Sequence, residues 1–264
     1  MRFGNLTVVA ASVVVLLGNA AWAEIRNQPI EYRDGPTVLE GYLSYDDATA
    51  DLRPGVLIAP EWWGLDEYPK HRAQQLARMG YVAFAIDMYG KGNVTNDPQQ
   101  AGQWMTPFAK DRSLMRRRAQ AGLDVLLGQK YVDSKRVGAI GYCFGGTVVL
   151  ELARAGAPLG GVISFHGGLG RTADEGPDKI TAKVLVCQGG DDPLAPVTAL
   201  PSFMDEMKLA NADYQVNVYS GAQHAFTNPA ASSRHIPGIA YNAQADKRSW
   251  MAMDDFFAEI FHQE

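Results

Sequence analysis

The chain has 264 residues, of which 47% are hydrophobic, and a formal net charge of -5. A chain of this length and composition can bury one substantial core, and α/β folds of this size usually form a single domain. Its charges are of mixed sign and leave no basic stripe that would neutralise a phosphate backbone, so nucleic acid is not an expected partner.

The first predicted feature is an export signal at the N-terminus. Arg2 precedes an apolar run over residues 6–17, and Ala21-Trp22-Ala23 follows that run. Signal peptidases read a charged start, a short apolar core and a small-x-small site, and this run is too short to span a bilayer permanently. We expect residues 1–23 to be a cleaved signal peptide and residues 24–264 to be one exported domain, periplasmic or secreted, without a stable membrane span. The alternative is a buried N-terminal helix or an uncleaved anchor.

The remaining elements follow an α/β pattern. From residue 54 onward, short apolar runs alternate with helical patterns, which is typical of βαβ units and a mostly parallel sheet. Buried strands are predicted over residues 56–59, 81–86, 137–141, 161–165, 184–187 and 214–219. Helices are expected near residues 69–79, 111–128, 145–155, 196–210 and 240–262.

Three stretches are less regular. Residues 25–48 suggest one or two antiparallel strands at the sheet edge. Residues 88–110 and 227–240 are rich in glycine, proline and polar residues, so we expect them to be loop excursions over the strand ends. Such loops often shape pockets.

The strongest chemical signal is Gly141-Tyr142-Cys143-Phe144-Gly145-Gly146, which joins a predicted strand to an apolar helical run. So tight a G-x-C-x-G turn strains the central residue and needs small residues two positions before and after it. The turn exposes Cys143 at a helix N-terminus, where the helix dipole stabilises a thiolate and the amide of Phe144 can point at a developing oxyanion. The alternative is a glycine-rich turn with an incidental cysteine.

Candidate partners for this cysteine lie downstream. A free thiol has a pKa of about 8.5, so Cys143 needs a base, and the base needs a third group that fixes its tautomer. Asp191 and Asp192 follow one predicted strand, and His224 follows the next. The carboxyl ends of strands are where an open α/β sheet gathers functional groups, and the order Cys, Asp, His is that of α/β-hydrolases. We therefore predict a triad of these three residue types.

Some assignments stay open at this level. Either aspartate can turn inward in so tight a loop; we prefer Asp192, which leaves Asp191 exposed or capping a helix. His166 also follows a predicted strand and is a candidate for the pocket wall. The second cysteine, Cys187, lies in its own apolar run, where buried thiols behave as small hydrophobes, so no disulfide is expected.

With these residues, the chain resembles the dienelactone hydrolase family of α/β-hydrolases from about residue 30 to residue 260. The family has a cysteine in a G-x-C-x-G-G elbow, an aspartate four residues before a proline, and a histidine in an H-x-F loop. The matching residues are Cys143 in its elbow, Asp192 with Pro196, and His224 with Phe226. The resemblance implies an α/β-hydrolase fold, with helices on both faces of a mostly parallel central sheet.

The family also carries a glutamate after the first major strand, which maps to Glu61-Trp62-Trp63-Gly64. The resemblance implies that Glu61 modulates the thiol, by holding it or by taking its proton, and that the amide of Trp62 is the second oxyanion donor. The alternative for Glu61 is a loop carboxylate that pairs with an arginine. Trp63, like Phe226 and His166, is a candidate for the pocket.

One departure concerns the substrate. Family members that hydrolyse dienelactone itself hold the substrate carboxylate with arginines, one of them four residues after the histidine, where this chain has Asn228. The natural substrate is therefore left open.

The sequence predicts a cysteine-dependent carboxylic ester or lactone hydrolase that forms an acyl-enzyme on a small-molecule substrate. No cluster of residues has metal-ligand spacing and no glycine run has the partners of a phosphate-binding fingerprint, so neither metal nor cofactor is expected. One alternative is a non-catalytic small-molecule-binding protein of the same fold; another is a thiol redox protein, which the absence of a C-x-x-C pair disfavours. The sequence does not set the oligomeric state, for which a monomer is the default expectation.

Overall fold

The central strands of the fold are apolar on both faces. The computed structural model describes Met1, residues 24–171 and residues 180–261. Along β3 (Arg53–Ala59), Leu57 packs into one core cluster while its neighbours Val56 and Ile58 pack into another. Because side chains alternate across a strand, such a strand must be covered by helices on both sides.

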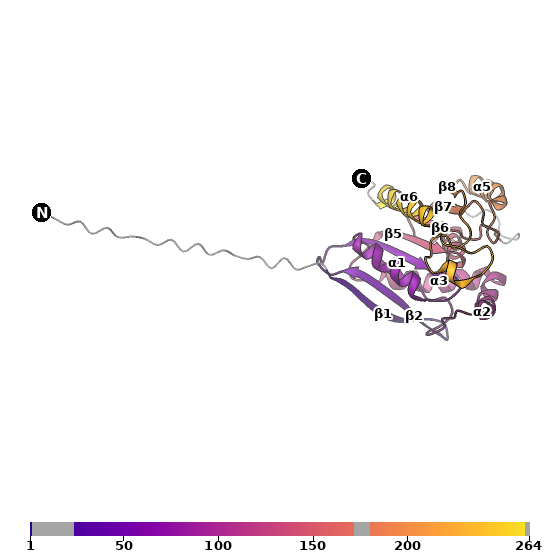
Figure 1. The fold of residues 1–264 in the computed structure, drawn as a ribbon. Helices are drawn as coiled ribbons and strands as arrows, with labels where there is room; N and C mark the ends of the chain where they lie inside the picture. Colours follow the sequence, from indigo (N-terminus) through magenta and orange to yellow (C-terminus); the bar gives the residue numbers. More distant parts are fainter. Residues whose placement is uncertain (2–23, 172–179, 262–264) are drawn as a thin grey trace.

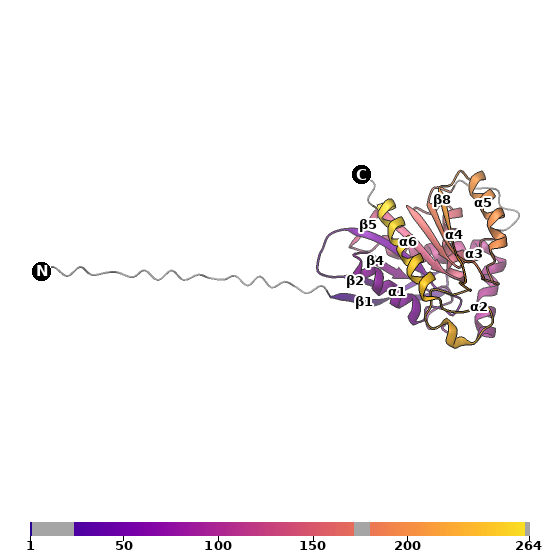
Figure 2. The same cartoon turned by 45° about the horizontal axis from the view of Figure 1, so that its top comes forward.

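Eight strands form one sheet, in the order β1-β2-β4-β3-β5-β6-β7-β8 (Figures 1 and 2). The first two pair antiparallel, β2 joins β4 antiparallel, and every other pair is parallel. The other strands are β1 (Ile25–Asp34), β2 (Thr37–Asp46), β4 (Val82–Ala85), β5 (Val132–Tyr142), β6 (Gly161–Phe165), β7 (Lys183–Gly189) and β8 (Tyr214–Tyr219). The predicted α/β-hydrolase fold is thus confirmed, including the antiparallel edge within residues 25–48.

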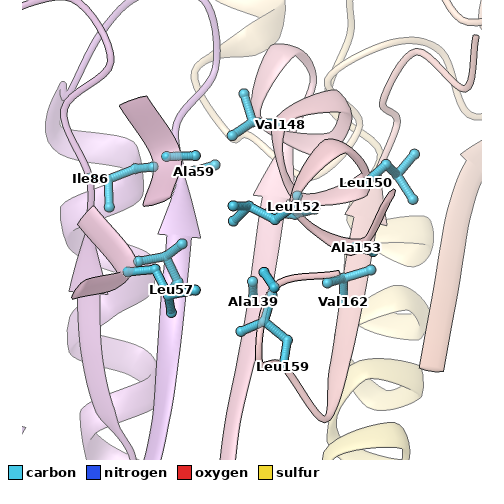
Figure 3. Close-up of a cluster of buried hydrophobic side chains, with 14 of the residues drawn as sticks. Leu57, Ala59, Ile86, Ala139, Val148, Leu150, Leu152, Ala153, Leu159 and Val162 are labelled. Atoms are coloured by element: carbon cyan, nitrogen blue, oxygen red, sulfur yellow. The ribbon is translucent and has the colours of Figure 1, made fainter. Parts of the chain in front are cut away.

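Helices cover both faces of the sheet (Figure 2). One face packs against α1 (Glu67–Arg78) and α6 (Ala243–Phe261). The other face packs against α3 (Arg112–Leu127), α4 (Phe144–Arg154) and α5 (Leu200–Leu209). Figure 3 shows the packing on this second face, where α4 side chains lie over the strands. Two short 3-10 helices, η1 (Val197–Ala199) and η2 (Ala231–Arg234), lie in loops.

One expectation is wrong: residues 88–110 are not all loop, because α2 (Pro98–Lys110) occupies their second half. Asp97 caps this helix by accepting a hydrogen bond from the amide of Gln99, and Pro98 is pre-organised for the first helical position. Pro98, Gly102 and Pro107 favour a loop in the sequence, but Pro98 begins the helix and Pro107 lies near its end. The helix therefore tolerates the residues that argued against it.

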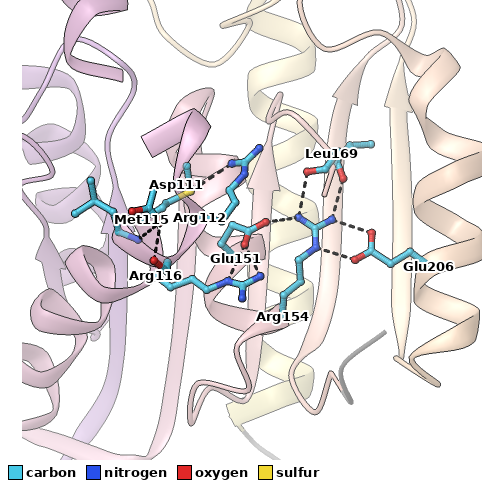
Figure 4. A network of polar contacts seen from close by, with 11 residues as sticks. Asp111, Arg112, Met115, Arg116, Glu151, Arg154, Leu169 and Glu206 are labelled. Atoms are coloured by element: carbon cyan, nitrogen blue, oxygen red, sulfur yellow. Dashed lines mark hydrogen bonds and ion pairs between the residues drawn. The ribbon is translucent and has the colours of Figure 1, made fainter. Parts of the chain in front are cut away.

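A buried ionic network ties α4 to its neighbours (Figure 4). Glu151 of α4 accepts hydrogen bonds from Arg116 at 2.8 Å and from Arg154 at 2.9 Å. Arg154 also donates to both carboxylate oxygens of Glu206 in α5, at 2.8 and 2.9 Å, and to the carbonyl of Leu169 at 2.8 Å. The network therefore fixes α3, α4, α5 and the segment after β6 relative to one another.

The predicted export signal lies outside the described residues, apart from Met1. No helix in the described part of the chain combines the length and the apolar character that crossing a membrane requires.

Candidate active site

Cys143 lies at the turn between β5 and α4, with φ of 54° and ψ of -116°. This left-handed backbone is unusual for a residue with a side chain and stores strain. The flanking glycines make the turn possible, because a Cβ on Gly141 would overlap the carbonyl oxygen of Gly145, and a Cβ on Gly145 would overlap that of Ala59. The elbow thus packs directly on the end of β3, and Cys143 stays partly exposed.

Asp192 and His224 meet beside the elbow. The Nδ1 atom of His224 lies 2.8 Å from Oδ2 of Asp192, and both residues are buried. The other carboxylate oxygen accepts hydrogen bonds from the amides of Leu194 and Ala195, each at 2.8 Å. A carboxylate held in this way keeps the proton of His224 on Nδ1 and leaves Nε2 for the nucleophile. Asp191 is exposed.

The electrostatics around His224 favour its protonated form. Burial disfavours the imidazolium, but the charge of Cys143 and hydrogen bonds to Asp192 and to Cys143 outweigh it, so the pKa of His224 is raised well above its usual value. A thiolate beside an imidazolium is the reactive form of a cysteine nucleophile. The geometry therefore brings together the three residues expected to form the triad.

Glu61 follows β3 and is almost completely buried, with 3% of its surface exposed. Its Oε2 accepts a hydrogen bond from Nδ2 of Asn228 at 2.7 Å. Burial is the main cause that raises the pKa of Glu61 to about 7, because the neutral amide compensates only part of the lost hydration. Glu61 and Asn228 line a small cavity together with Cys143 and His224. Asn228, at the position where an arginine was expected, is thus a partner of Glu61.

The raised pKa of Glu61 predicts a pH-dependent effect on stability. The unfolded carboxyl titrates near 4.5 and the folded one near 7, so the folded state binds the proton more tightly between these values and loses stability as pH rises through them. Glu61→Gln keeps an acceptor for Asn228 without a charge, and should raise the free energy of unfolding at pH 8 by about 2 to 3 kcal/mol more than at pH 5. Urea unfolding at the two pH values measures the difference; an equal effect at both would contradict the assignment.

An apolar cleft opens beside Cys143, with a volume of about 370 Å³. Cys143, His224, Trp62 and Phe144 line it together. Residues from α2, α3 and α4 and from the segments after β6, β7 and β8 form the remaining wall, namely Met105, Ala109, Arg112, Met115, Thr147, Gly168, Leu194, Ala195 and Ile239. Sequence reasoning missed Met105 and Ala109 because residues 88–110 were expected to be a loop, and it missed the rest because distant segments supply them.

The two residues predicted to donate to the oxyanion, Phe144 and Trp62, line the same cleft as Cys143. Phe144 is the first residue of α4, and the first amides of a helix have no carbonyl partner within it. Trp62 belongs to the segment after β3 against which Gly145 packs. Both amides are thus on backbone that borders Cys143, as an oxyanion site requires.

The pocket candidates are only partly placed in the wall. Trp63 lines the small cavity, where the guanidinium carbon of Arg234 lies over its ring, 4.0 Å from the ring centroid. His166 and Phe226, in contrast, are completely buried and line neither cavity. The ring of His166 packs edge-on against that of His224, and the ring of Phe226 packs on His166 in turn.

Within the described residues, no three histidine, cysteine or carboxylate side chains gather in a way that could hold a metal ion.

Comparison with known proteins agrees with this geometry. The family model described as "Dienelactone hydrolase family" matches residues 39–261. The chain belongs to the dienelactone hydrolase family. A solved dienelactone hydrolase-like promiscuous phosphotriesterase from metagenomic libraries superposes with a TM-score of 0.86 at 43% identity, covering 90% of this chain and 99% of that one.

Curated relatives of this dienelactone hydrolase family member carry hydrolase names. A putative carboxymethylenebutenolidase of Aquifex aeolicus is 29% identical over 222 residues, which are 82% of this chain and 94% of the relative. A probable 2-oxo-3-(5-oxofuran-2-ylidene)propanoate lactonase of a Bradyrhizobium species is 29% identical over 198 residues, or 70% and 77% of the two chains. Family membership and these names support a hydrolase.

Proposed function

We propose that this family member is a cysteine-dependent carboxylic ester or lactone hydrolase. The observation that carries the proposal is the contact of His224 with both Asp192, at 2.8 Å, and the side chain of Cys143, which lies on a strained elbow at the end of an apolar cleft. A redox or purely binding role would not need this arrangement.

The proposed mechanism has two halves. The thiolate of Cys143 adds to the substrate carbonyl, and the amides of Phe144 and Trp62 hold the oxyanion. His224 gives its proton to the departing alcohol oxygen, and an acyl-enzyme remains on the sulfur. A water then loses a proton to His224, its oxygen attacks the thioester, and the acid leaves as the thiolate is restored.

The test is a substrate panel for the wild-type protein. It contains p-nitrophenyl esters of two to eight carbons, an enol lactone, and a neutral phosphotriester, which is included because a solved relative at 43% identity is named a promiscuous phosphotriesterase. Since the cleft wall is mainly apolar, we expect turnover of esters and a KM that falls as the acyl chain lengthens. Absence of turnover across the panel would contradict the proposal and favour the binding-protein alternative.

Export is a separate proposal, supported by the charge and hydropathy pattern of residues 1–23. If the signal is cleaved as predicted, N-terminal sequencing of the protein recovered from the periplasm or the medium should give Glu24 as the first residue.

A further inference from the structure

His166 joins the two loops that carry Cys143 and His224. It follows β6, has a left-handed backbone with φ of 41°, and has no exposed surface. Its Nδ1 accepts a hydrogen bond from the backbone amide of Cys143 at 3.1 Å. The same amide also donates to the carbonyl oxygen of Phe165 at 3.0 Å. Its Nε2 lies 2.8 Å from Oγ1 of Thr227, three residues after His224. One imidazole therefore contacts the elbow on one side and the loop of the base on the other.

These contacts fix the tautomer of His166. Because Nδ1 accepts from an amide, it has no proton, so the neutral ring must carry its proton on Nε2 and donate to Thr227. A protonated ring would point an N–H at the amide of Cys143. Burial first, then the charges of His224 and Arg72, lower the pKa of His166 well below its usual value and so maintain the neutral form.

Thr227 is itself anchored to the body of the protein. Its hydroxyl lies 2.7 Å from the hydroxyl of Tyr68 in α1, and its carbonyl accepts a hydrogen bond from Arg72 at 2.8 Å. Arg72 pairs with Asp246 of α6 and lies over the ring of Trp250 at 4.7 Å. The loop after β8 is therefore held by buried side chains of α1 as well as by its own backbone.

We infer that His166 and Thr227 are positioning residues, which brace the elbow of Cys143 against the loop of His224 and so keep the two reacting side chains in contact. The ring of His166 also packs edge-on against that of His224, with centroids 5.2 Å apart, so movement of one ring displaces the other. This inference presupposes the proposed hydrolase function, and adds two residues that touch no substrate, because neither lines the cleft.

The titratable and charged groups that face this brace come from several elements: Cys143 and Tyr142 from the end of β5, His224 from the loop after β8, and Tyr68 and Arg72 from α1. Glu61, whose pKa is raised to about 7, lines the small cavity with Cys143 and His224 and titrates in the same range, so the alkylation of Cys143 is compared between wild type and variants at each pH.

The test compares Thr227→Val, which keeps the shape of the side chain but removes the hydroxyl, with Thr227→Ser, which keeps the hydroxyl. T227V removes the hydroxyl that contacts both His166 and Tyr68, and loss of the contact with His166 should lower kcat for p-nitrophenyl acetate about tenfold. KM should change little, and T227S should retain the wild-type rate. Peptide mass spectrometry measures the rate at which iodoacetamide alkylates Cys143 between pH 5 and pH 9. In T227V a given alkylation rate should be reached only at a higher pH, because the contact between Cys143 and His224 is loosened. His166→Phe should shift the alkylation profile in the same direction.

Thermal unfolding of each variant separates positioning from general stability. A T227V protein with the wild-type kcat and alkylation profile would overturn the inference. So would a T227S protein whose kcat is reduced as much as that of T227V. If Cys143 of the folded wild-type protein is alkylated no faster than a free thiol, and the protein hydrolyses no ester, the proposed hydrolase function is wrong. The positioning role of His166 and Thr227 is then wrong as well.

Discussion

Replacing Cys143 by alanine should reduce ester turnover by roughly 10⁴-fold or more, since removal of the nucleophile from a triad leaves only binding and oxyanion stabilisation. The cleft and the fold should persist, because the side chain is small and partly exposed. Steady-state rates at equal folded concentration measure the loss. Retention of the wild-type rate in C143A would exclude a nucleophilic role.

Cys187→Ala is the matched control for this variant. Cys187 is completely buried, with its sulfur 3.6 Å from the hydroxyl of Tyr219, and burial raises its pKa to about 12, so it remains an unreactive thiol. The control should keep full turnover. A comparable loss in both variants would point to a shared structural defect instead.

Replacing Arg154 by methionine should destabilise the protein by about 3 to 5 kcal/mol, the cost typical of breaking a buried ion pair on one side. The change leaves the carboxylate of Glu206 buried without its two hydrogen bonds and removes the donor to Leu169. It also releases a segment adjoining Gly168, which lines the cleft. Urea unfolding measures the free-energy change.

Arg117→Met is the control variant in which an exposed ion pair is broken in place of a buried one. Arg117 also pairs with a carboxylate, Asp34, at 2.8 Å, but 61% of its side chain is exposed, and Asp34 keeps its second bond to Arg118. Exposed pairs contribute about 0 to 1 kcal/mol, so this variant should unfold close to the wild type. Equal losses in R117M and R154M would show that burial is not what makes the network stabilising.

The parallel sheet and the elbow were predictable because their signals are local. Buried strands such as residues 161–165 are continuous apolar runs, and the glycines around Cys143 reflect overlaps within a single turn. The preference for Asp192 over Asp191 rested on weaker grounds, and the contact with His224 depends on how the loop after β7 turns. Sequence spacing alone cannot give that direction.

The remaining features are set by contacts between distant segments. Asn228 meets Glu61 across 167 residues, and His166 meets Thr227 across 61, so neither pairing has a local pattern. The α2 helix was missed because its composition resembles a loop, although Asp97 at its cap and Pro98 at its first position were visible signals of a helix start.

The most direct test of the central claim is to mix the protein with a p-nitrophenyl ester, quench with acid within the first turnover, and locate the acyl group by peptide mass spectrometry. The proposed mechanism predicts a thioester on the peptide that contains Cys143, accompanied by a burst of nitrophenol, and neither in C143A. Continued turnover with an unmodified Cys143, or an acyl group on another residue, would contradict it.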